Sequence, residues 1–325
     1  MDNQTLLYHY TSVDGLYGII ENKNIRLTNI SYLNDSKELV LATIKFKSHM
    51  REMVENLKIN NEATELSIFN GFQSNKEEDK FLPQNHFFAE LLIDYIEGYL
   101  DKMLSAPAIY TASFCEKGNL LRQWMAYCSN GGYSIGFDRQ MLKTSIEGAG
   151  KINLSKVGYD MSSVLSMFST DDFEELSKQT SSQYDKIFTA CQENQELALA
   201  SDDFKDLLAN ILSEVKKFAS NIAQFSITHK HLDFQYELEH RLIKNSGHFD
   251  SAGNYVENLN GINFYPKNSL LVPHIQHEIT LDAIKKVFIG PMSNQHLAYL
   301  SLLRFRDSKK LDFEVVKSEI SLRTL

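Results

Sequence analysis

Hydrophobic and polar residues alternate along several short stretches of this 325-residue chain, which is the pattern of strands with one buried face. The clearest stretch is 133–137, where apolar side chains at every second position follow the turn signal Asn130-Gly131-Gly132. Alternation or a short apolar run also predicts strands at 8–10, 25–28, 108–115, 152–159, 238–243, 261–265, 269–281, 286–291 and 313–317.

Helical periodicity dominates two longer regions. Apolar residues recur three and four positions apart over 39–57 and 87–104, and a longer apolar stripe runs over 204–225. The region from about 161 to 226 carries helix formers almost throughout, so we predict a helical insertion packed on a sheet domain. The insertion could act as a lid or have a purely structural role. Shorter helices are predicted at 13–20, 120–128, just after Asp138, and 293–304.

The order of these elements bounds the fold. Strands and helices mix without a regular β–α–β alternation, which favours an α+β fold over a doubly wound parallel sheet. Neither a GxGxxG motif nor a Walker-type loop occurs, which argues against Rossmann and P-loop nucleotide chemistry. We therefore predict a single domain over 1–325, with a mixed or antiparallel sheet, flanking helices and the insertion at about 161–226.

Composition narrows the class of protein. With 43% hydrophobic and 23% charged residues, the chain has the make-up of a soluble globular protein. The formal charge of −9 argues against nonspecific coating of nucleic acid but leaves room for a local basic cleft. Three cysteines without a C-x-x-C motif argue against a disulfide framework, so we expect a cytoplasmic location. We also expect no signal peptide and no membrane-spanning segment.

His9 is the sharpest single candidate residue. It lies in a predicted strand that leads directly to Thr11, Ser12 and an apolar helix, a common way to present a ligand-binding group. One imidazole nitrogen can donate a hydrogen bond while the other accepts one, which suits a ligand hydroxyl group. The alternative is a buried histidine that satisfies backbone groups.

The segment 236–241 is the other strong constellation. On a strand, Glu237, Glu239 and Arg241 would share one face. Two carboxylates and a guanidinium are costly to bury unless they pair, and Arg241 would hold at least one carboxylate ionised. The alternative is a surface salt-bridge ladder with little energetic weight.

Further polar and aromatic residues complete the list of candidates. Tyr10, Tyr127 and Tyr133 could stack on a ligand ring, although most of the fifteen tyrosines must be structural. Asn34 could bind a ligand through its side-chain amide. The neighbouring segment 35–38 has the form of a capping box, which accounts for its carboxylates without a ligand.

Metal and acyl-transfer chemistry are not predicted. The histidine pairs at 229/231 and 274/277 lack cysteine or carboxylate partners at metal-ligand spacing, so we assign no metal. No Gly-x-Ser-x-Gly motif occurs either.

Four stretches, in this order, resemble a bacterial family catalogued as domain of unknown function 2971: LYHYTSVDGLYGIIENKNIRLTNISYLND, SFCEKGNLLRQWMAYCSNGGYSIGFD, HKHLDFQYELEHRLI and the tail VFIGP…VVKSEISLR. The family is similar, more distantly, to the ADP-ribosyltransferase fold. Tyr8-His9-Tyr10-Thr11 followed by an apolar helix looks like the NAD-binding opening of DarT-type DNA ADP-ribosyltransferases.

That resemblance implies an ADP-ribosyltransferase-like fold and an enzyme that uses NAD. His9 would hydrogen-bond the adenosine ribose, while Tyr10 and Thr11 would help to seat the dinucleotide. A carboxylate, Glu239 first and Glu237 second, would stabilise the positive charge that develops at the ribose C1′ when nicotinamide leaves.

The partners implied by the resemblance are NAD and an acceptor, either nucleic acid or protein. By analogy, it also implies a toxin or antiphage defence effector with a neutralising or regulatory partner protein. Two other functions stay open: a non-catalytic module that binds a nucleotide or a partner through the same fold, and an NAD glycohydrolase with water as acceptor.

Overall fold

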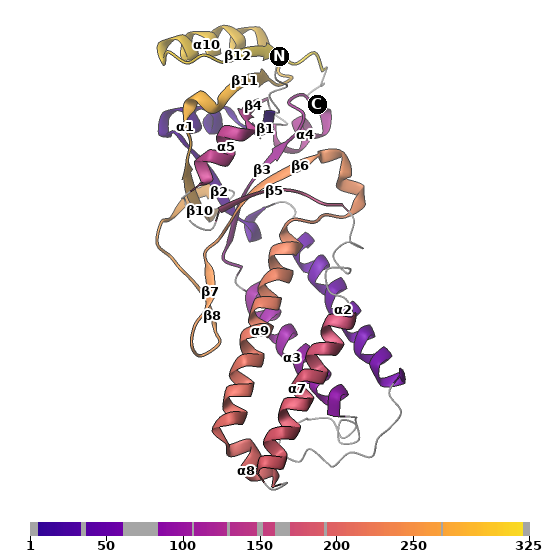
Figure 1. Cartoon of the computed structure of the whole chain (residues 1–325). Helices are drawn as coiled ribbons and strands as arrows, with labels where there is room; N and C mark the ends of the chain where they lie inside the picture. Colours follow the sequence, from indigo (N-terminus) through magenta and orange to yellow (C-terminus); the bar gives the residue numbers. More distant parts are fainter. Residues whose placement is uncertain are drawn as a thin grey trace.

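The computed structural model describes residues 6–33, 37–60, 84–105, 107–128, 131–147, 152–159, 170–191, 194–267 and 269–320. A sheet part and a bundle of long helices follow one another along the length of the molecule (Figure 1). The candidate Asn34 and the predicted helix cap Asp35 lie outside the described residues.

Ten strands of the described chain form one sheet, with β12-β11-β4-β1-β3-β2-β10-β9 in spatial order and β6 and β5 continuing from the other edge of β3. Every pairing in it is antiparallel except that of β11 with β12. The strands are β1 (Leu6–Thr11), β2 (Asn24–Asn29), β3 (Ile109–Cys115), β4 (Tyr133–Asp138), β5 (Ile152–Lys156), β6 (Glu239–Asn245), β9 (Ile262–Lys267), β10 (Leu270–Glu278), β11 (Ile284–Ile289) and β12 (Glu314–Lys317).

A separate two-stranded ribbon, β7 (Gly247–Phe249) and β8 (Tyr255–Glu257), extends from the sheet part alongside the helical bundle (Figure 1), and Phe249 packs against the bundle core. The protein is therefore α+β with a mostly antiparallel mixed sheet and flanking helices, as the sequence predicted. The finer prediction, an ADP-ribosyltransferase-like fold, stays a prediction.

The helices of the sheet part start where local signals place them. Helix α1 (Val13–Asn22) begins after Ser12, whose hydroxyl accepts a hydrogen bond from the Gly15 N–H at 3.2 Å. Helix α5 (Arg139–Ile146) begins after Asp138, which accepts from the Met141 N–H at 2.9 Å. Helix α1 buries its apolar face on the sheet, and α4 (Leu121–Tyr127) and α10 (Gln295–Ser308) complete this part.

One edge of β3 is divided between two strands. Strand β6 pairs with the other edge of β3 along its full length. On the divided edge, β1 pairs with β3 at Tyr8 and Cys115, whereas β2 pairs with it near Thr28 and Thr111. Because β1 and β2 diverge between these points, residues 112–114 have no strand partner on that edge among the described residues. The divergence leaves a wedge in the sheet.

The helical part is a bundle assembled from two segments that are distant in sequence. Its core contains apolar residues of α2, α3, α7 and α9, so the predicted insertion packs on the first helical segment. Among the described residues, the insertion meets the apolar core of the sheet at the end of α9, where Ile227 shares a cluster with Ile109 and Ile243. The bundle helices are α2 (Lys37–Asn60), α3 (Gln84–Ser105), α7 (Thr170–Ala190), α8 (Gln195–Ala200) and α9 (Asp202–Ile227).

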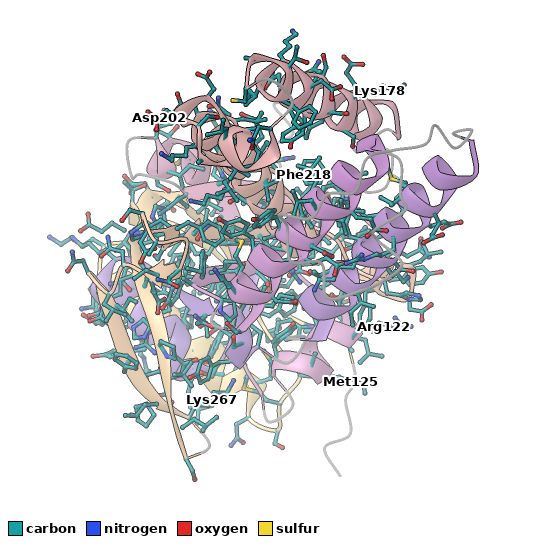
Figure 2. All side chains as sticks on the ribbon, turned by 90° about the horizontal axis from the view of Figure 1, so that it is seen from below. Arg122, Met125, Lys178, Asp202, Phe218 and Lys267 are labelled. Atoms are coloured by element: carbon teal, nitrogen blue, oxygen red, sulfur yellow. The ribbon has the colours of Figure 1, made fainter. Side chains whose placement is uncertain are left out.

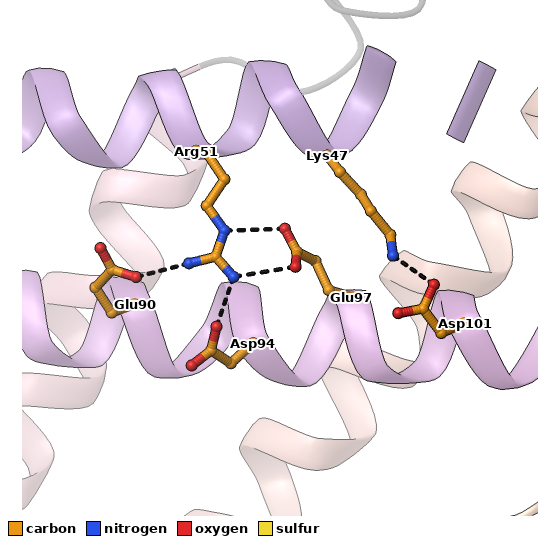
Figure 3. Close-up of polar contacts among 6 residues, drawn as sticks. All are labelled: Lys47, Arg51, Glu90, Asp94, Glu97 and Asp101. Carbon is orange, nitrogen blue, oxygen red and sulfur yellow. Dashed lines mark hydrogen bonds and ion pairs between the residues drawn. The ribbon is translucent and has the colours of Figure 1, made fainter. Parts of the chain in front are cut away.

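Charged side chains join α2 to α3 on the outside of the bundle (Figure 3). Arg51 of α2 donates to Glu90 at 2.9 Å, to Asp94 at 2.6 Å and to Glu97 at 3.0 Å, all three on α3. These four residues are referred to below as the Arg51 clamp. The hydrogen bonds that Arg51 donates to Glu97 raise the pKa of Arg51, although 36% of its side chain is exposed.

Candidate functional site

A cavity of about 770 Å³ occupies the wedge between β1, β2 and β3. Its walls come from these strands, from α1, α4, the start of β6 and β9, and from the 3₁₀ turn η3 (Leu232–Glu237) that precedes β6. Elements from both ends of the chain therefore meet at this one cavity, which is within the size range of small-molecule sites.

Most of the predicted site residues line this cavity. His9 and Glu239, which are far apart in sequence, lie in the same hollow of the sheet. The predicted residues in its wall are His9, Tyr10, Thr11, Tyr127, Glu237, Glu239 and Arg241.

Tyr133 does not belong to the wall. It is 7% exposed and belongs to the sheet core. It lies on β4, between Thr11 of β1 on one side and Ile289 of β11 on the other. Tyr127, by contrast, lines the cavity and is 42% exposed. Between Tyr127 and Tyr133, the geometry therefore favours Tyr127 for stacking on a ligand ring.

Four charged side chains form a buried network at one end of the cavity. The Glu239 carboxylate accepts two hydrogen bonds from Arg241, at 2.8 Å from Nε and 3.1 Å from Nη2. Lys230 Nζ lies 2.8 Å from Glu237 Oε2 and 3.0 Å from Glu239 Oε2, so it bridges the two glutamates. These residues, Lys230, Glu237, Glu239 and Arg241, are called the carboxylate cluster. Only Glu237 is appreciably exposed, with 20% of its side chain accessible.

The backbone at Leu238 brings the two glutamates together. The sequence prediction that Glu237 and Glu239 share a strand face is wrong, because β6 begins at Glu239 and Glu237 ends the 3₁₀ turn. Leu238, between them, has φ 47° and ψ 48°, a left-handed conformation that is uncommon for a residue with a branched side chain. The Glu239 N–H donates to the Tyr159 hydroxyl at 2.9 Å, which holds the start of the strand.

Glu239 is ionised in the neutral pH range. Burial alone would raise the pKa of this carboxyl group, but the positive charges of Arg241 and Lys230 outweigh it and lower the pKa to about 2. The same two cations offset the two carboxylates, so the cluster as a whole carries little net charge. Its effect on a ligand depends on which atoms face the cavity.

The side chain of His9, from β1, reaches the segment 112–114 of β3, which has no described strand partner on this edge. Its Nδ1 donates a hydrogen bond to the Ser113 carbonyl at 2.9 Å, since a carbonyl oxygen can only accept. Burial lowers the pKa of His9, which favours the neutral ring. In that tautomer Nε2 is an acceptor, so one nitrogen satisfies the backbone and the other is available to a ligand hydroxyl.

Tyr10 has a positioning function in this structure. Its hydroxyl donates to the Lys117 carbonyl at 2.8 Å and accepts from the Leu120 N–H at 2.9 Å. Its ring meets Trp124 edge-on, with the centroids 4.7 Å apart. Tyr10 therefore fixes the loop before α4. Its ring lines the cavity, while its hydroxyl is engaged in hydrogen bonds to the backbone of that loop. Thr11 ends β1 so close to α1 that a β-carbon at Gly15 would collide with its hydroxyl oxygen.

The sequence did not point to several residues of this cavity. Lys230 lies between His229 and His231, and it is the central cation of the cluster. Gln123 lines the cavity, is 8% exposed and forms no side-chain hydrogen bond with the described residues. Arg26 and Lys267, from β2 and β9, line the opposite end. Lys230 lies in a family-like stretch, but lysine alone carries no pattern that indicates burial.

The described residues show no group of three or more histidine, cysteine, aspartate or glutamate side chains arranged to hold a metal ion. Within the same ranges, no helix combines the length and apolarity needed to cross a bilayer. Cys115, Cys128 and Cys191 are free thiols.

Comparison with known proteins yields a single family. No curated protein and no solved structure matches the chain. The model of the family described as "Protein of unknown function (DUF2971)" matches residues 123–242, a range that runs from Gln123 in α4 to β6 and includes the whole carboxylate cluster. This match confirms the family resemblance seen in the sequence over residues 123–242.

Proposed function

We propose that this protein is an ADP-ribosyltransferase-like enzyme that uses NAD as its substrate. The observation that carries the proposal is the meeting of His9 and the carboxylate cluster in one cavity, at the point where the sheet divides. A neutral imidazole with a free acceptor nitrogen suits a ribose hydroxyl, and an ionised carboxylate suits a developing cation.

The proposed reaction begins with loss of nicotinamide. The bond between the ribose C1′ and the nicotinamide nitrogen breaks, and its electron pair leaves with nicotinamide. The ribose then carries oxocarbenium-like positive charge, which Glu239 stabilises from a site that is 5% exposed. A nucleophile of the acceptor attacks C1′ and loses its proton.

The two glutamates would have different tasks. Both oxygens of Glu239 already accept hydrogen bonds from Arg241, which orients the carboxylate rigidly. Glu237 is more accessible and bonds to Lys230 through Oε2. In the proposal, Glu239 acts mainly through its fixed charge, whereas Glu237 can contact a ribose or acceptor hydroxyl directly.

The acceptor is nucleic acid or protein, and a cytoplasmic toxin or antiphage defence role with a neutralising partner follows from the resemblance alone. One observation favours a second candidate, a non-catalytic module that binds a nucleotide. Glu239 already forms ion pairs with both Lys230 and Arg241, so a purely structural role in shaping the cavity would also account for this carboxylate. With water as acceptor, the same site would be an NAD glycohydrolase.

Incubation with NAD tests the proposal. The protein should release nicotinamide, and a transferase should also label a component of a mixture of nucleic acids and proteins with ADP-ribose. Free ADP-ribose alone would identify a glycohydrolase. H9A should weaken NAD binding, whereas H248A, which changes an exposed histidine on β7, should not. Absence of both NAD binding and nicotinamide release would refute the enzyme proposal.

A further inference from the structure

The end of the cavity formed by β2 and β9 is basic and aromatic. Arg26 of β2 and Tyr265 and Lys267 of β9 all line it. Strand β10 lies between β2 and β9, and the two registers place the side chains of these three residues on the same face of the sheet. Figure 2 shows Lys267 at the end of these strands, across the sheet part from Arg122 and Met125 of α4.

The cations at this end have no anionic partner in the described chain. The Arg26 guanidinium lies over the Tyr265 ring, 5.3 Å from its centroid, and makes no ion pair or hydrogen bond with a described residue. Lys267 is exposed and likewise has no such partner among them. The acidic residues at the opposite end, Glu237 and Glu239, are already paired with Lys230 and Arg241. Of the other lining residues only Asp14, exposed in the first turn of α1, is acidic.

The Tyr265 ring, over which Arg26 lies, packs against a second ring. Tyr265 packs edge-on against His274, with ring centroids 5.4 Å apart, and His274 is 3% exposed. Burial lowers the pKa of His274, which keeps that ring neutral beside the guanidinium. Stacking on Tyr265 restricts Arg26 to a position from which its planar fork of donors can meet an incoming anion.

We propose that Arg26 and Lys267 form a subsite for a phosphate-bearing group in this cavity. A guanidinium donates two parallel hydrogen bonds to phosphate oxygens, and the Lys267 ammonium on the same wall of the cavity adds a second point charge. The phosphate comes either from the diphosphate of a dinucleotide bound along the cavity or from an acceptor that enters at the exposed β9 side. The subsite deepens the proposed function, but its existence does not depend on turnover.

Direct binding measurements test the subsite. Calorimetry at low salt would compare inorganic pyrophosphate, ADP-ribose, a short single-stranded oligonucleotide, adenosine and succinate on the wild-type protein, R26Q, K267Q and the double variant. The double variant should bind at least one phosphate probe about tenfold or more weakly, because two charge-assisted contacts are lost. Adenosine binding should not change. R304Q and K143Q, which remove exposed cations on α10 and α5, should leave all affinities within about twofold.

The pattern of losses identifies the source of the phosphate. Weaker binding of ADP-ribose assigns the subsite to the dinucleotide, whereas loss confined to the oligonucleotide assigns it to an acceptor. Pyrophosphate binding that depends on Arg26 in a protein that does not bind NAD would keep the subsite and reject the proposed function. The subsite is overturned if the wild type binds no phosphate probe, if the control variants lose as much affinity, or if succinate binds as tightly as pyrophosphate.

Discussion

The carboxylate cluster and the Arg51 clamp use the same chemistry in opposite environments. Each joins cationic and anionic side chains, within the short segment 230–241 in the cluster and between α2 and α3 in the clamp. In the cluster, side-chain exposure is 1% for Lys230 and 6% for Glu239. In the clamp it is 36% for Arg51 and 63% for Asp94. The two regions therefore separate the effect of burial from the effect of charge pairing.

The comparison indicates why each network exists. Exposed ion pairs typically contribute between about 0 and 1 kcal/mol, so the clamp chiefly sets how α2 lies on α3. Buried ion pairs often cost more in desolvation than they return, and well-packed apolar residues can replace them without loss of stability. Stability is therefore a poor explanation for a buried charged cluster beside a cavity. Its position supports the proposed role of binding or acting on a ligand.

The largest expected effect comes from removing the central cation of the cluster. K230M should lower the free energy of unfolding by roughly 3 kcal/mol or more, because Glu237 and Glu239 would face each other without their shared partner. Urea denaturation measures this loss. The matched control K217M removes a lysine of α9 whose side chain is 66% exposed, and it should change stability by less than about 0.5 kcal/mol. Equal effects of the two variants would contradict the distinction between the networks.

Acid should weaken the cluster in a defined pH range. The pKa of Glu239 is lowered from an ordinary value of 4.5 to about 2, so its contribution is complete above pH 4.5 and is lost as the pH falls towards 2. The loss attributable to this residue is about 3 kcal/mol. Denaturation of the wild type and E239Q between pH 6 and 2 isolates it, since only the wild type contains the titrating group. Parallel pH profiles would show that Glu239 is not held ionised by its partners.

The smallest expected effect belongs to the clamp. R51M should cost about 1 kcal/mol or less, and added salt should shrink that cost because the partners are reached by solvent. Urea denaturation at low and high salt measures both quantities. A loss as large as that of K230M, with no dependence on salt, would mean that exposure does not distinguish the two networks.

Local signals in the sequence predicted much of the fold. Side-chain caps at Ser12 and Asp138 mark two helix starts correctly, and alternation over 133–137 marks a central strand. Those patterns depend on near neighbours in the chain. The division of the β3 edge between β1 and β2 depends on pairing across about a hundred residues, so no local pattern reveals it. The union of the two helical segments into one bundle is a long-range event of the same kind.

For the candidate site, too, local patterns could be read from the sequence but long-range contacts could not. His9 and Glu239 could be singled out because their residue types and surroundings are chemically unusual for a strand end. Lys230 could not, since its burial results from a tertiary contact with two glutamates. Glu237 was placed on the wrong element because the left-handed turn at Leu238 has no glycine or asparagine to announce it.

The most direct test of the central claim is nicotinamide release from NAD by E239Q, expressed per folded molecule. Because Glu239 is buried and bound to Arg241, this variant is expected to be less stable, so melting curves must first define a temperature at which it is folded. At that temperature the account predicts a fall in kcat of on the order of a hundredfold or more, with NAD affinity changed only a few-fold. A kcat equal to that of the wild type would contradict the account and leave Glu239 as a structural partner of Arg241.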